Sequence, residues 1–528
     1  MRKLLITIVG ILALALACHA VSVSAAAGGK GVFPLPLVGA QQGEARETGS
    51  KSTAPAHFSA PVRLDCKSEV NTVSFSPDDR LLGISTNAGD VFLYDIGAKK
   101  IRRIAKHKRG VGGISFSPNG RYVAWRRSAG RNVVYDLWQE QEIWEFAAHT
   151  RWATALAFSA CSQILLTGGE DGRIASWDII RKKKILELEA HSKSDRCPIT
   201  GIDVASSNKV FASASWDNTI RICELNTGRE LIKIKGYGEF ASACFSRDGK
   251  MIVGAAPYDT NLRIWEVATG LERLRLPQPP GVLAIALHGS GRWLAVGDRA
   301  GNIQLVNIYS GQQTTIKALH TKLIFCVAIS HDGRRIATGS WDKTVAIVDL
   351  GEFEGEPKRL EPSNEDLNEQ IPNLFSKNAA TAFKAIRLLT KSAKTVPLLQ
   401  KTLTNVRRDV PIDANFKAVL KRLESGSYLV REKASSKLAK MELGIESRKM
   451  LEGVVQASSS PEVKNRLRVI VGKMTLPSRE RLFWLRSLEI LEQIGDSKAK
   501  KLLEEIAQQE DGVGEEARFS LNRLKKNY

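Results

Sequence analysis

The sequence has little that points to catalysis. It contains no P-loop, no GxSxG elbow, no HExxH pair and no GxGxxG fingerprint after a strand, so the usual marks of nucleotide, serine and zinc chemistry are missing. Paired acidic residues such as Asp78 and Asp79 occur only in turns or on expected helix faces. These absences argue against an enzyme, and we predict neither a catalytic residue nor a cofactor.

Cysteine is sparse and poorly spaced for chemistry. The chain holds seven cysteines, without a CxxC pair or a Cys/His group at zinc spacing, which argues against a metal site. Cys223, Cys244 and Cys326 fall within strand patterns, where cysteine acts as a small buried apolar residue. We therefore predict structural thiols and no metal.

Long apolar runs are missing after the N-terminus. Arg2 and Lys3 precede an apolar stretch at residues 4–17, which is typical of a signal peptide and too short to favour a spanning helix. Cleavage after residue 25, which makes 1–25 the signal, competes with lipidation of Cys18 in a lipobox-like sequence, and we favour cleavage. Residues 26–57 show no apolar period, which predicts a flexible tether. We expect an exported protein, periplasmic or extracellular, with a lipid anchor if Cys18 is used.

Acidic residues are outnumbered, but the basic excess is not concentrated. There are 77 Lys and Arg against 56 Asp and Glu, which gives a formal charge of +21, and no five like charges follow one another. Two interpretations stay open: a solvated basic surface, or a footprint for a polyanionic polymer or an anionic envelope surface. Export argues against nucleic acid as the natural ligand.

The chain is rich in internal repeats. An apolar strand anchor recurs at intervals of 41, 42, 46, 41, 42 and 42 residues: Phe75, Phe116, Phe158, Val204, Phe245, Leu287 and Ile329. A second anchor follows each one after 19 residues, or once after 20: Tyr94, Tyr135, Trp177, Cys223, Trp265, Val306 and Val348. One such unit cannot bury its apolar face alone, so the seven units must stack. Alternating strands between turn residues predict antiparallel four-stranded sheets.

Three further marks agree in register. The second anchor is followed by an acid in Trp177-Asp178 and Trp265-Glu266. A histidine precedes the first anchor by nine residues, and an aspartate follows it by thirteen, in several units: His107, His149, His320, Asp171, Asp217 and Asp342. With these marks, residues 58–350 resemble WD40 repeats. The resemblance implies an all-β, seven-bladed propeller.

The resemblance also implies a buried hydrogen-bond network inside some blades. The third repeat carries the full family set of His149, Thr167, Asp171 and Trp177. The seventh carries His320, Thr338 and Asp342, with valine in place of tryptophan, and the fourth carries Ser213 and Asp217 behind a displaced His191. Repeats one, two, five and six are expected to rely on packing. These histidines are therefore predicted to be structural.

A partner-binding face is the second implication of the family. In WD40 proteins the residue before the turn aspartate tends to face partners at the narrower end, and here it is Trp216, Trp341 or Glu170. Arg151 and Trp152 lie close to them in the repeat register. Aromatic and arginine side chains on a concave surface are typical binding hot spots. The alternative, that the tryptophans pack against adjacent loops, stays open.

The flanks of the repeats complete the architecture. Residues 58–65 predict a strand that pairs with the third strand of the seventh repeat and closes the ring. Residues 351–364 predict a linker, and 365–528 switch to a helical period. The expected helices are 379–390, 413–423, 427–441, 445–456, 462–474, 479–494 and 497–508. They resemble HEAT-like pairs, an all-α repeat domain, and the whole chain is similar to exported bacterial WD40 proteins with a helical extension.

Two repeat-built domains without catalytic groups predict a scaffold. We expect the propeller face to bind a protein or peptide partner, with the helical domain as a second surface. The alternative function is binding of a polyanionic polymer or an anionic envelope surface through basic residues.

Overall fold

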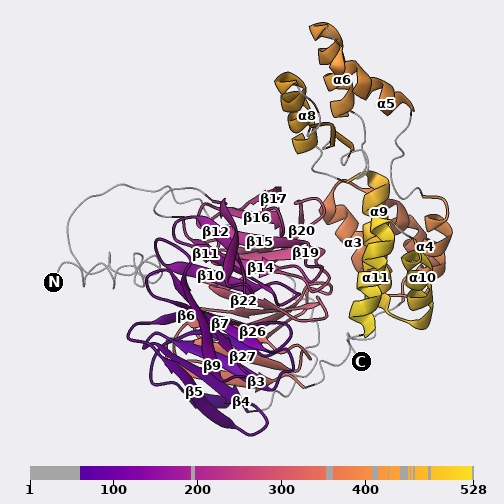
Figure 1. The fold of residues 1–528 in the computed structure, drawn as a ribbon. Helices are drawn as coiled ribbons and strands as arrows, with labels where there is room; N and C mark the ends of the chain where they lie inside the picture. The colour runs from indigo at the N-terminus through magenta and orange to yellow at the C-terminus, as the bar shows by residue number, and fades with distance from the viewer. Residues whose placement is uncertain are drawn as a thin grey trace, which may run out of the picture. The chain divides into compact units, whose positions relative to one another are not determined.

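The structure is a computed structural model that describes residues 60–191, 197–351, 361–406, 414–425, 427–440, 450–451, 453–455, 458, 460–473, 477–509 and 511–525. The predicted signal peptide, Cys18 and the tether lie outside these residues. Seven antiparallel four-stranded sheets form a propeller, and a helical region follows (Figure 1). The predicted fold class is therefore confirmed. Within the described part of the chain, every helix is too short or too polar to cross a membrane.

Each blade is built from strands that follow one another in the sequence. Blade one is β2 (Val70–Phe75), β3 (Leu81–Thr86), β4 (Asp90–Asp95) and β5 (Lys100–Lys106); blade two is β6 (Val111–Phe116), β7 (Tyr122–Arg127), β8 (Arg131–Asp136) and β9 (Gln141–Ala147). Blade three is β10 (Ala153–Phe158), β11 (Ile164–Gly169), β12 (Arg173–Asp178) and β13 (Lys183–Glu189); blade four is β14 (Ile199–Val204), β15 (Val210–Ser215), β16 (Thr219–Glu224) and β17 (Glu230–Lys235). Blade five is β18 (Ser242–Phe245), β19 (Met251–Ala255), β20 (Asn261–Glu266) and β21 (Glu272–Pro277); blade six is β22 (Ala284–Leu287), β23 (Trp293–Gly297), β24 (Ile303–Asn307) and β25 (Gln313–Ile316).

Blade seven combines the two ends of the propeller sequence. It is β26 (Ile324–Ile329), β27 (Arg335–Ser340) and β28 (Thr344–Asp349), completed by β1 (Val62–Asp65). β1 runs antiparallel to β28, in a register that places Val62 opposite Ile347 and Asp65 opposite Thr344. The predicted closing strand is confirmed. It covers the edge that β28 would otherwise leave open.

The two ends of the propeller differ in their connections. The first strands of neighbouring blades contact one another around the ring, so they are innermost and surround the central axis. Because strands alternate in direction, the turns between strands one and two and between strands three and four lie at one end, which we call the turn end. The links between strands two and three and between successive blades lie at the other end, the loop end. In blade three the turn end comprises residues 159–163 and 179–182, and the loop end comprises 148–152 and 170–172.

A buried serine shapes the turn between the first two strands. In blade two the Ser117 hydroxyl accepts the backbone N–H of Tyr122 at 2.8 Å, which satisfies a donor at the start of the second strand. Serines in blades one, three, five and seven accept the same bond. Gly120 follows at φ 72°, a left-handed conformation that glycine adopts without strain. The serine and the left-handed residue together explain the short, regular turns of the repeat.

The helical region mixes predicted and unexpected elements. It comprises α2 (Asn364–Gln370), η1 (Ile371–Phe375), α3 (Ala379–Leu389), α4 (Thr395–Leu403), α5 (Ala414–Lys421), η2 (Arg422–Glu424), α6 (Tyr428–Lys440), α8 (Pro461–Lys473), α9 (Arg479–Ile494), α10 (Ser497–Ala507) and α11 (Gly512–Lys525). Six of the expected helices are confirmed, and the seventh, 445–456, falls largely outside the described residues. α2, α4 and α11 were not expected from the sequence. In α4, Pro397 lies in the first turn, where it is tolerated, and in α11 two early glycines weaken the helical pattern.

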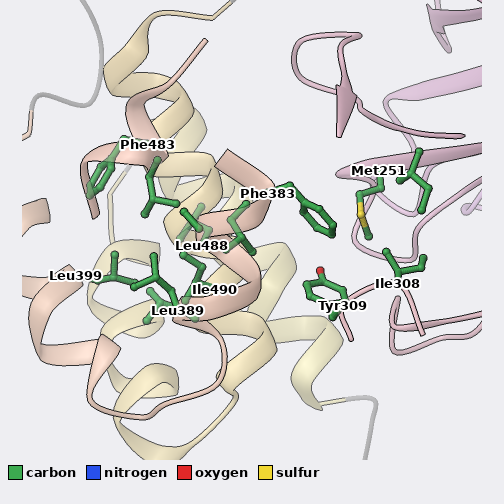
Figure 2. Close-up of a cluster of buried hydrophobic side chains, with 14 of the residues drawn as sticks. Met251, Ile308, Tyr309, Phe383, Leu389, Leu399, Phe483, Leu488 and Ile490 are labelled. Carbon is green, nitrogen blue, oxygen red and sulfur yellow. The ribbon is translucent and has the colours of Figure 1, made fainter. Parts of the chain in front are cut away.

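The helical region contributes to two separate cores. Phe416, Leu438 and Leu467 belong to a core made by α5, α6 and α8. The other core is continuous with the propeller: Met251 and Tyr309 from blades five and six belong to the same buried cluster as side chains of α3 and α9 (Figure 2). This second core fixes α3 and α9 against the propeller.

Candidate functional site

The four residues predicted for the third-repeat network lie together. His149 Nδ1 is 3.1 Å from Asp171 Oδ1, and His149 Nε2 is 3.0 Å from Thr167 Oγ1. Trp177 Nε1 donates to the same hydroxyl at 2.9 Å. Burial opposes ionisation of Asp171, but the hydrogen bond from His149 helps to hold the pKa of this carboxyl below its ordinary value. The chain of bonds ties a loop-end connection to the second and third strands of the blade.

Blade seven holds the equivalent network without a tryptophan. His320 Nδ1 is 3.0 Å from Asp342 Oδ2, and His320 Nε2 is 2.8 Å from Thr338 Oγ1. Thr344 Oγ1 is also 3.0 Å from Nδ1. Burial is the main reason that the pKa of His320 is lowered, which favours the neutral ring inside this network.

Two further histidines extend this picture beyond the sequence analysis. The displaced His191 still reaches Asp217 at 3.0 Å and Ser213 at 2.7 Å. In blade two, the fully buried Trp125 donates from Nε1 to His107 Nε2 at 3.0 Å. The expectation that blade two relies on packing alone was therefore wrong. Trp125 occupies the register position of Thr167 and is long enough to reach the histidine directly.

The predicted partner residues all lie at the loop end of the propeller. Trp152, Trp216 and Trp341 are half-buried there, Glu170 is half-buried and Arg151 is exposed. The Glu170 backbone N–H donates to the Trp152 carbonyl at 3.0 Å, so the loop before blade three and its 170–172 loop are joined. Trp216 belongs to blade four and Trp341 to blade seven. The residues thus share one end of the propeller rather than a single pocket.

The loop-end tryptophans are partly packed against the propeller and partly exposed. Trp341 stacks on Phe325, with ring centroids 5.8 Å apart and an interplanar angle of 26°. One face of Trp341 is therefore covered by its own blade, and the half-burial leaves part of it accessible. An aromatic ring held in this way loses little conformational entropy when a partner packs on it.

The loop end also carries exposed cations, whereas the described acidic residues in its connections are half-buried. The exposed cations are Lys67, Lys108, Arg109, Arg151, Arg299, Lys317, Lys322 and Lys343. Burial raises the pKa of Glu170, and Arg151 opposes this effect. An electropositive rim around half-buried aromatic rings suits a partner that carries negative charge.

The helical region docks at the other end, through four buried charges. Arg273 on β21 makes two bonds of 2.9 Å to the Glu489 carboxylate on α9. Arg273 also donates to Glu266 on β20 at 2.7 Å, and Arg486 on α9 makes two bonds of 2.9 Å to the same Glu266. All four side chains are at most 2% exposed. We call Glu266, Arg273, Arg486 and Glu489 the junction cluster.

Further groups bond to the junction cluster and fix its geometry, although Arg273 Nε is buried without a hydrogen-bond partner. Arg486 Nη1 donates to the carbonyls of Leu374 and Ser376 at 2.7 Å each, and the Tyr309 hydroxyl donates to Glu489 at 3.2 Å. Burial raises the pKa of Glu266, but Arg273 and Arg486 outweigh it and lower this pKa to about 2. Glu266 is therefore ionised at neutral pH, and its charge is opposed by the two arginines that bond to it.

Other contacts between the two regions fall at the same end. Arg292 Nε donates to Gln493 at 2.9 Å, and Lys209 pairs with Glu515 at 2.5 Å. A cavity of about 380 Å³ lies in this junction between turns of blades five and six and the ends of α9 and α11. Two of its charges, Arg523 and Glu492, are bonded to each other at 2.6 Å. The helical region thus occupies the turn end of blades four to six.

Metal-binding groups do not gather in the described residues. Across these residues, no three His, Cys, Asp or Glu side chains are close enough to hold an ion together. The described cysteines are free thiols, and burial raises the pKa of Cys66 and Cys223 to about 12. Such thiols are neutral and unreactive at physiological pH.

Comparison with known families decides the repeat type. The family model "WD domain, G-beta repeat" matches residues 140–178, 182–224 and 311–349. The chain carries WD40 repeats. Each matched segment begins near the fourth strand of one blade and continues through three strands of the next, so the sequence repeat is offset by one strand from the blade of the WD40 propeller.

Several eukaryotic proteins are similar to part of this chain. Periodic tryptophan protein 2 of Saccharomyces cerevisiae is 24% identical over 348 residues, which cover 54% of this chain and 38% of that protein. A guanine nucleotide-binding protein subunit beta of Oryza sativa subsp. japonica is 27% identical over 28% of this chain and 43% of its own length. A protein LST8 homolog of Drosophila pseudoobscura is 28% identical over 22% of this chain and 39% of its own length. The chain spans less than half of each of these relatives.

Proposed function

We propose that this protein is an exported, non-enzymatic scaffold that binds a protein partner at the loop end of its WD40 propeller. One observation carries the proposal. The helical region packs on the turn end through the junction cluster, whereas Trp152, Trp216 and Trp341 lie half-buried at the opposite end. Half-buried aromatic rings within a basic rim are typical of interaction hot spots.

Two further points support parts of this proposal. The rice relative is, by name, a subunit of a guanine nucleotide-binding protein, so a similar propeller is used inside an assembly. Export rests on the charged and apolar pattern of residues 1–25. The helical region supplies a second surface, which would let the chain hold two partners at once.

A comparison of tryptophan variants tests the binding face. The mature chain and its Trp152/Trp216/Trp341→Ala form would be used to isolate partners from the envelope fraction of the producing cells. Trp138→Ala is the matched control, because Trp138 is 73% exposed and lies in the 137–140 turn at the turn end. We expect the triple variant to lose a partner that the wild type and the control retain.

Salt dependence separates this function from polyanion binding. If all three forms bring down the same material and release it as salt is raised, counterion release dominates and the basic surface is the binding feature. That result would overturn the scaffold proposal. Retention by the triple variant in molar salt would do so as well.

A further inference from the structure

One register position distinguishes blade two from the other six. The fifth residue of the second strand is small in every other blade: Ser85, Gly168, Ala214, Ala255, Gly297 and Gly339. In blade two this residue is Arg126. A long cation therefore lies where the repeat otherwise places a small residue, at the loop end of β7.

The first strand of the same blade, β6, carries glycines where it faces this arginine. β6 carries Gly112 and Gly113 in succession, and no other first strand of the ring has two adjacent glycines. A Cβ at Gly112 would lie 2.7 Å from Arg126 Cζ, and one at Gly113 would lie 2.9 Å from Arg126 Nε. The strand register also shifts between Val111 and Ile114. The arginine and the glycine pair thus occur together and form one cradle.

The cradle leaves the guanidinium only partly satisfied. Arg126 Nη1 donates to the Ala153 carbonyl at 2.7 Å, which lies at the start of the first strand of blade three. Its Nε is buried and has no hydrogen-bond partner. Among the residues that the structure describes, no carboxylate lies at ion-pair distance from Arg126. Burial lowers the pKa of Arg126 to about 10, which still leaves it charged at neutral pH.

A buried guanidinium with an incomplete set of hydrogen bonds destabilises the folded protein unless an anion binds to it. Burying a charge without a paired, hydrogen-bonded counter-charge destabilises a protein. Arg126 is half-buried as a whole, so part of the side chain remains accessible. Its guanidinium lies against β6 and bonds to the start of β10, and so lies between blades two and three at the loop end. The same end holds Trp152, Arg151 and Glu170.

We propose that Arg126 anchors an aspartate or glutamate side chain of the protein partner, which enters between blades two and three at the loop end, beside Trp152. This inference rests on the proposed function, since it assigns the partner chemistry of the loop end. Carboxylates form strong, directional hydrogen bonds with guanidinium groups. Glu170 acts electrostatically on both Arg126 and Arg151, and Asp171 acts on Glu170. The two arginines are thus already matched by two nearby carboxylates, which suits a single incoming carboxylate better than a polyanion.

Paired peptides on an array test the inference. The full mature chain would be probed with peptides that are acetylated and amidated at their ends and carry either Glu or Gln at the centre, in varied flanking sequences. We expect the wild type to prefer Glu over Gln by roughly tenfold or more in at least one flanking context, as for a hydrogen bond to a charged group. A third set with free C-terminal carboxylates tests the other source of this chemistry, and a preference confined to that set would overturn the assignment to a side chain.

Two substitutions at adjacent positions provide the matched comparison. Arg126→Gln is expected to erase the Glu preference. Arg127→Gln is the control, because Arg127 pairs with Glu145 at 2.6 Å and should not affect the preference. A wild type without a Glu preference, or an Arg126→Gln variant that keeps it, would overturn the proposal.

A chemical route keeps the test decisive if Arg126→Gln does not fold. Phenylglyoxal modification of the wild type, mapped to Arg126 by mass spectrometry, must then reduce the Glu preference in proportion to the modified fraction, and an unchanged preference overturns the proposal. The variants also distinguish a failure of this inference from a failure of the proposed function. If the tryptophan variant loses its partner but Arg126→Gln binds it unchanged, only this inference fails. If the tryptophan variant keeps its partner, the loop-end function itself fails.

Discussion

Breaking the junction cluster should separate the helical region from the propeller. We consider Glu266→Gln, which keeps the size of the side chain and removes its charge. Glu266 accepts bonds from Arg273 at 2.7 Å and from Arg486 at 2.9 Å, with all three side chains at most 2% exposed. The substitution leaves two buried guanidinium groups to share the single carboxylate of Glu489.

The expected cost follows from the ionisation of Glu266. Its pKa falls from an ordinary 4.5 to about 2 in the folded protein, and each unit corresponds to about 1.4 kcal/mol. The ionised form thus contributes about 3 kcal/mol at neutral pH, which agrees with the usual cost of about 3–5 kcal/mol for removing one partner of a buried pair. We expect the free energy of unfolding to fall by about 3 kcal/mol.

The loss of stability caused by Glu266→Gln should depend on pH in a definite direction. The folded pKa of Glu266 lies below the unfolded one, so its contribution is complete above pH 4.5 and is lost as the pH falls from 4.5 towards 2. Glutamine does not titrate. The difference in stability between wild type and Glu266→Gln should therefore be constant near neutrality and should shrink in that acidic window.

Urea unfolding of the full chain is the assay, followed by far-UV circular dichroism for the helices and tryptophan fluorescence for both regions. Glu187→Gln is the control: Glu187 also meets two cations, Arg173 at 3.1 Å and Lys184 at 2.8 Å, but is 37% exposed, so its loss should cost less than about 1 kcal/mol. A Glu266→Gln effect no larger than that of the control, or one independent of pH down to pH 3, would show that the Glu266 charge does not stabilise the junction.

Three further predictions concern the propeller alone. Thr167→Val should cost about 1–3 kcal/mol in thermal or urea unfolding, because it removes the hydroxyl that bonds to His149 Nε2 and accepts from Trp177 Nε1. Thr167→Ser keeps the hydroxyl and should cost clearly less, and equal losses would contradict the network. Gly130→Ala should lower the free energy of unfolding by about 2 kcal/mol more than Gly120→Ala. Both glycines have positive φ, but only at Gly130 would a Cβ meet the carbonyl oxygens of residues 149 and 151. Equal losses of stability in calorimetry would argue against this contact. Deleting residues 60–65 removes β1 and should split the single unfolding transition, so that the urea midpoints from fluorescence and from circular dichroism differ. Deleting residues 27–55 should leave one transition. Coincident midpoints after the first deletion would show that ring closure does not depend on β1.

The propeller was predictable because its information is local and repeated. The strand anchors recur at a nearly fixed spacing in all seven repeats, and the histidine and aspartate marks recur in several of them. These weak patterns support one another. The closing strand was predictable for a related reason: an alternating segment before the first repeat fits the open edge of the last. The blade-three network followed from the same register, since His149 and Thr167 stand at conventional repeat positions.

The junction between the regions was not predictable from periodicity. Glu266 and Arg486 are 220 residues apart in sequence, and no repeat links them. The residue after the second anchor did not mark it, because blades four and five both have glutamate there, Glu224 and Glu266. A signal existed on the helical side: Arg486 and Glu489 lie three residues apart on an otherwise apolar face of α9, which marks a buried polar contact.

The cradle of Arg126 escaped the sequence analysis for a different reason. Its signal appears only when the seven second strands are placed in register and compared position by position. The compensating glycines belong to the neighbouring strand β6, and only the structure shows that they face the arginine. Departures from a repeat therefore carry functional information that the repeat itself does not.

Site-specific photo-cross-linking would show directly whether partners bind at the loop end. A photoreactive amino acid would replace Lys343, exposed beside Trp341 at the loop end, or Trp138, exposed at the turn end, and both proteins would be irradiated in the envelope fraction of the producing cells. We predict a discrete cross-linked partner from position 343, lost on adding Trp152/Trp216/Trp341→Ala, and none from position 138. A partner captured from position 138 alone, or equally from both positions, would contradict the account.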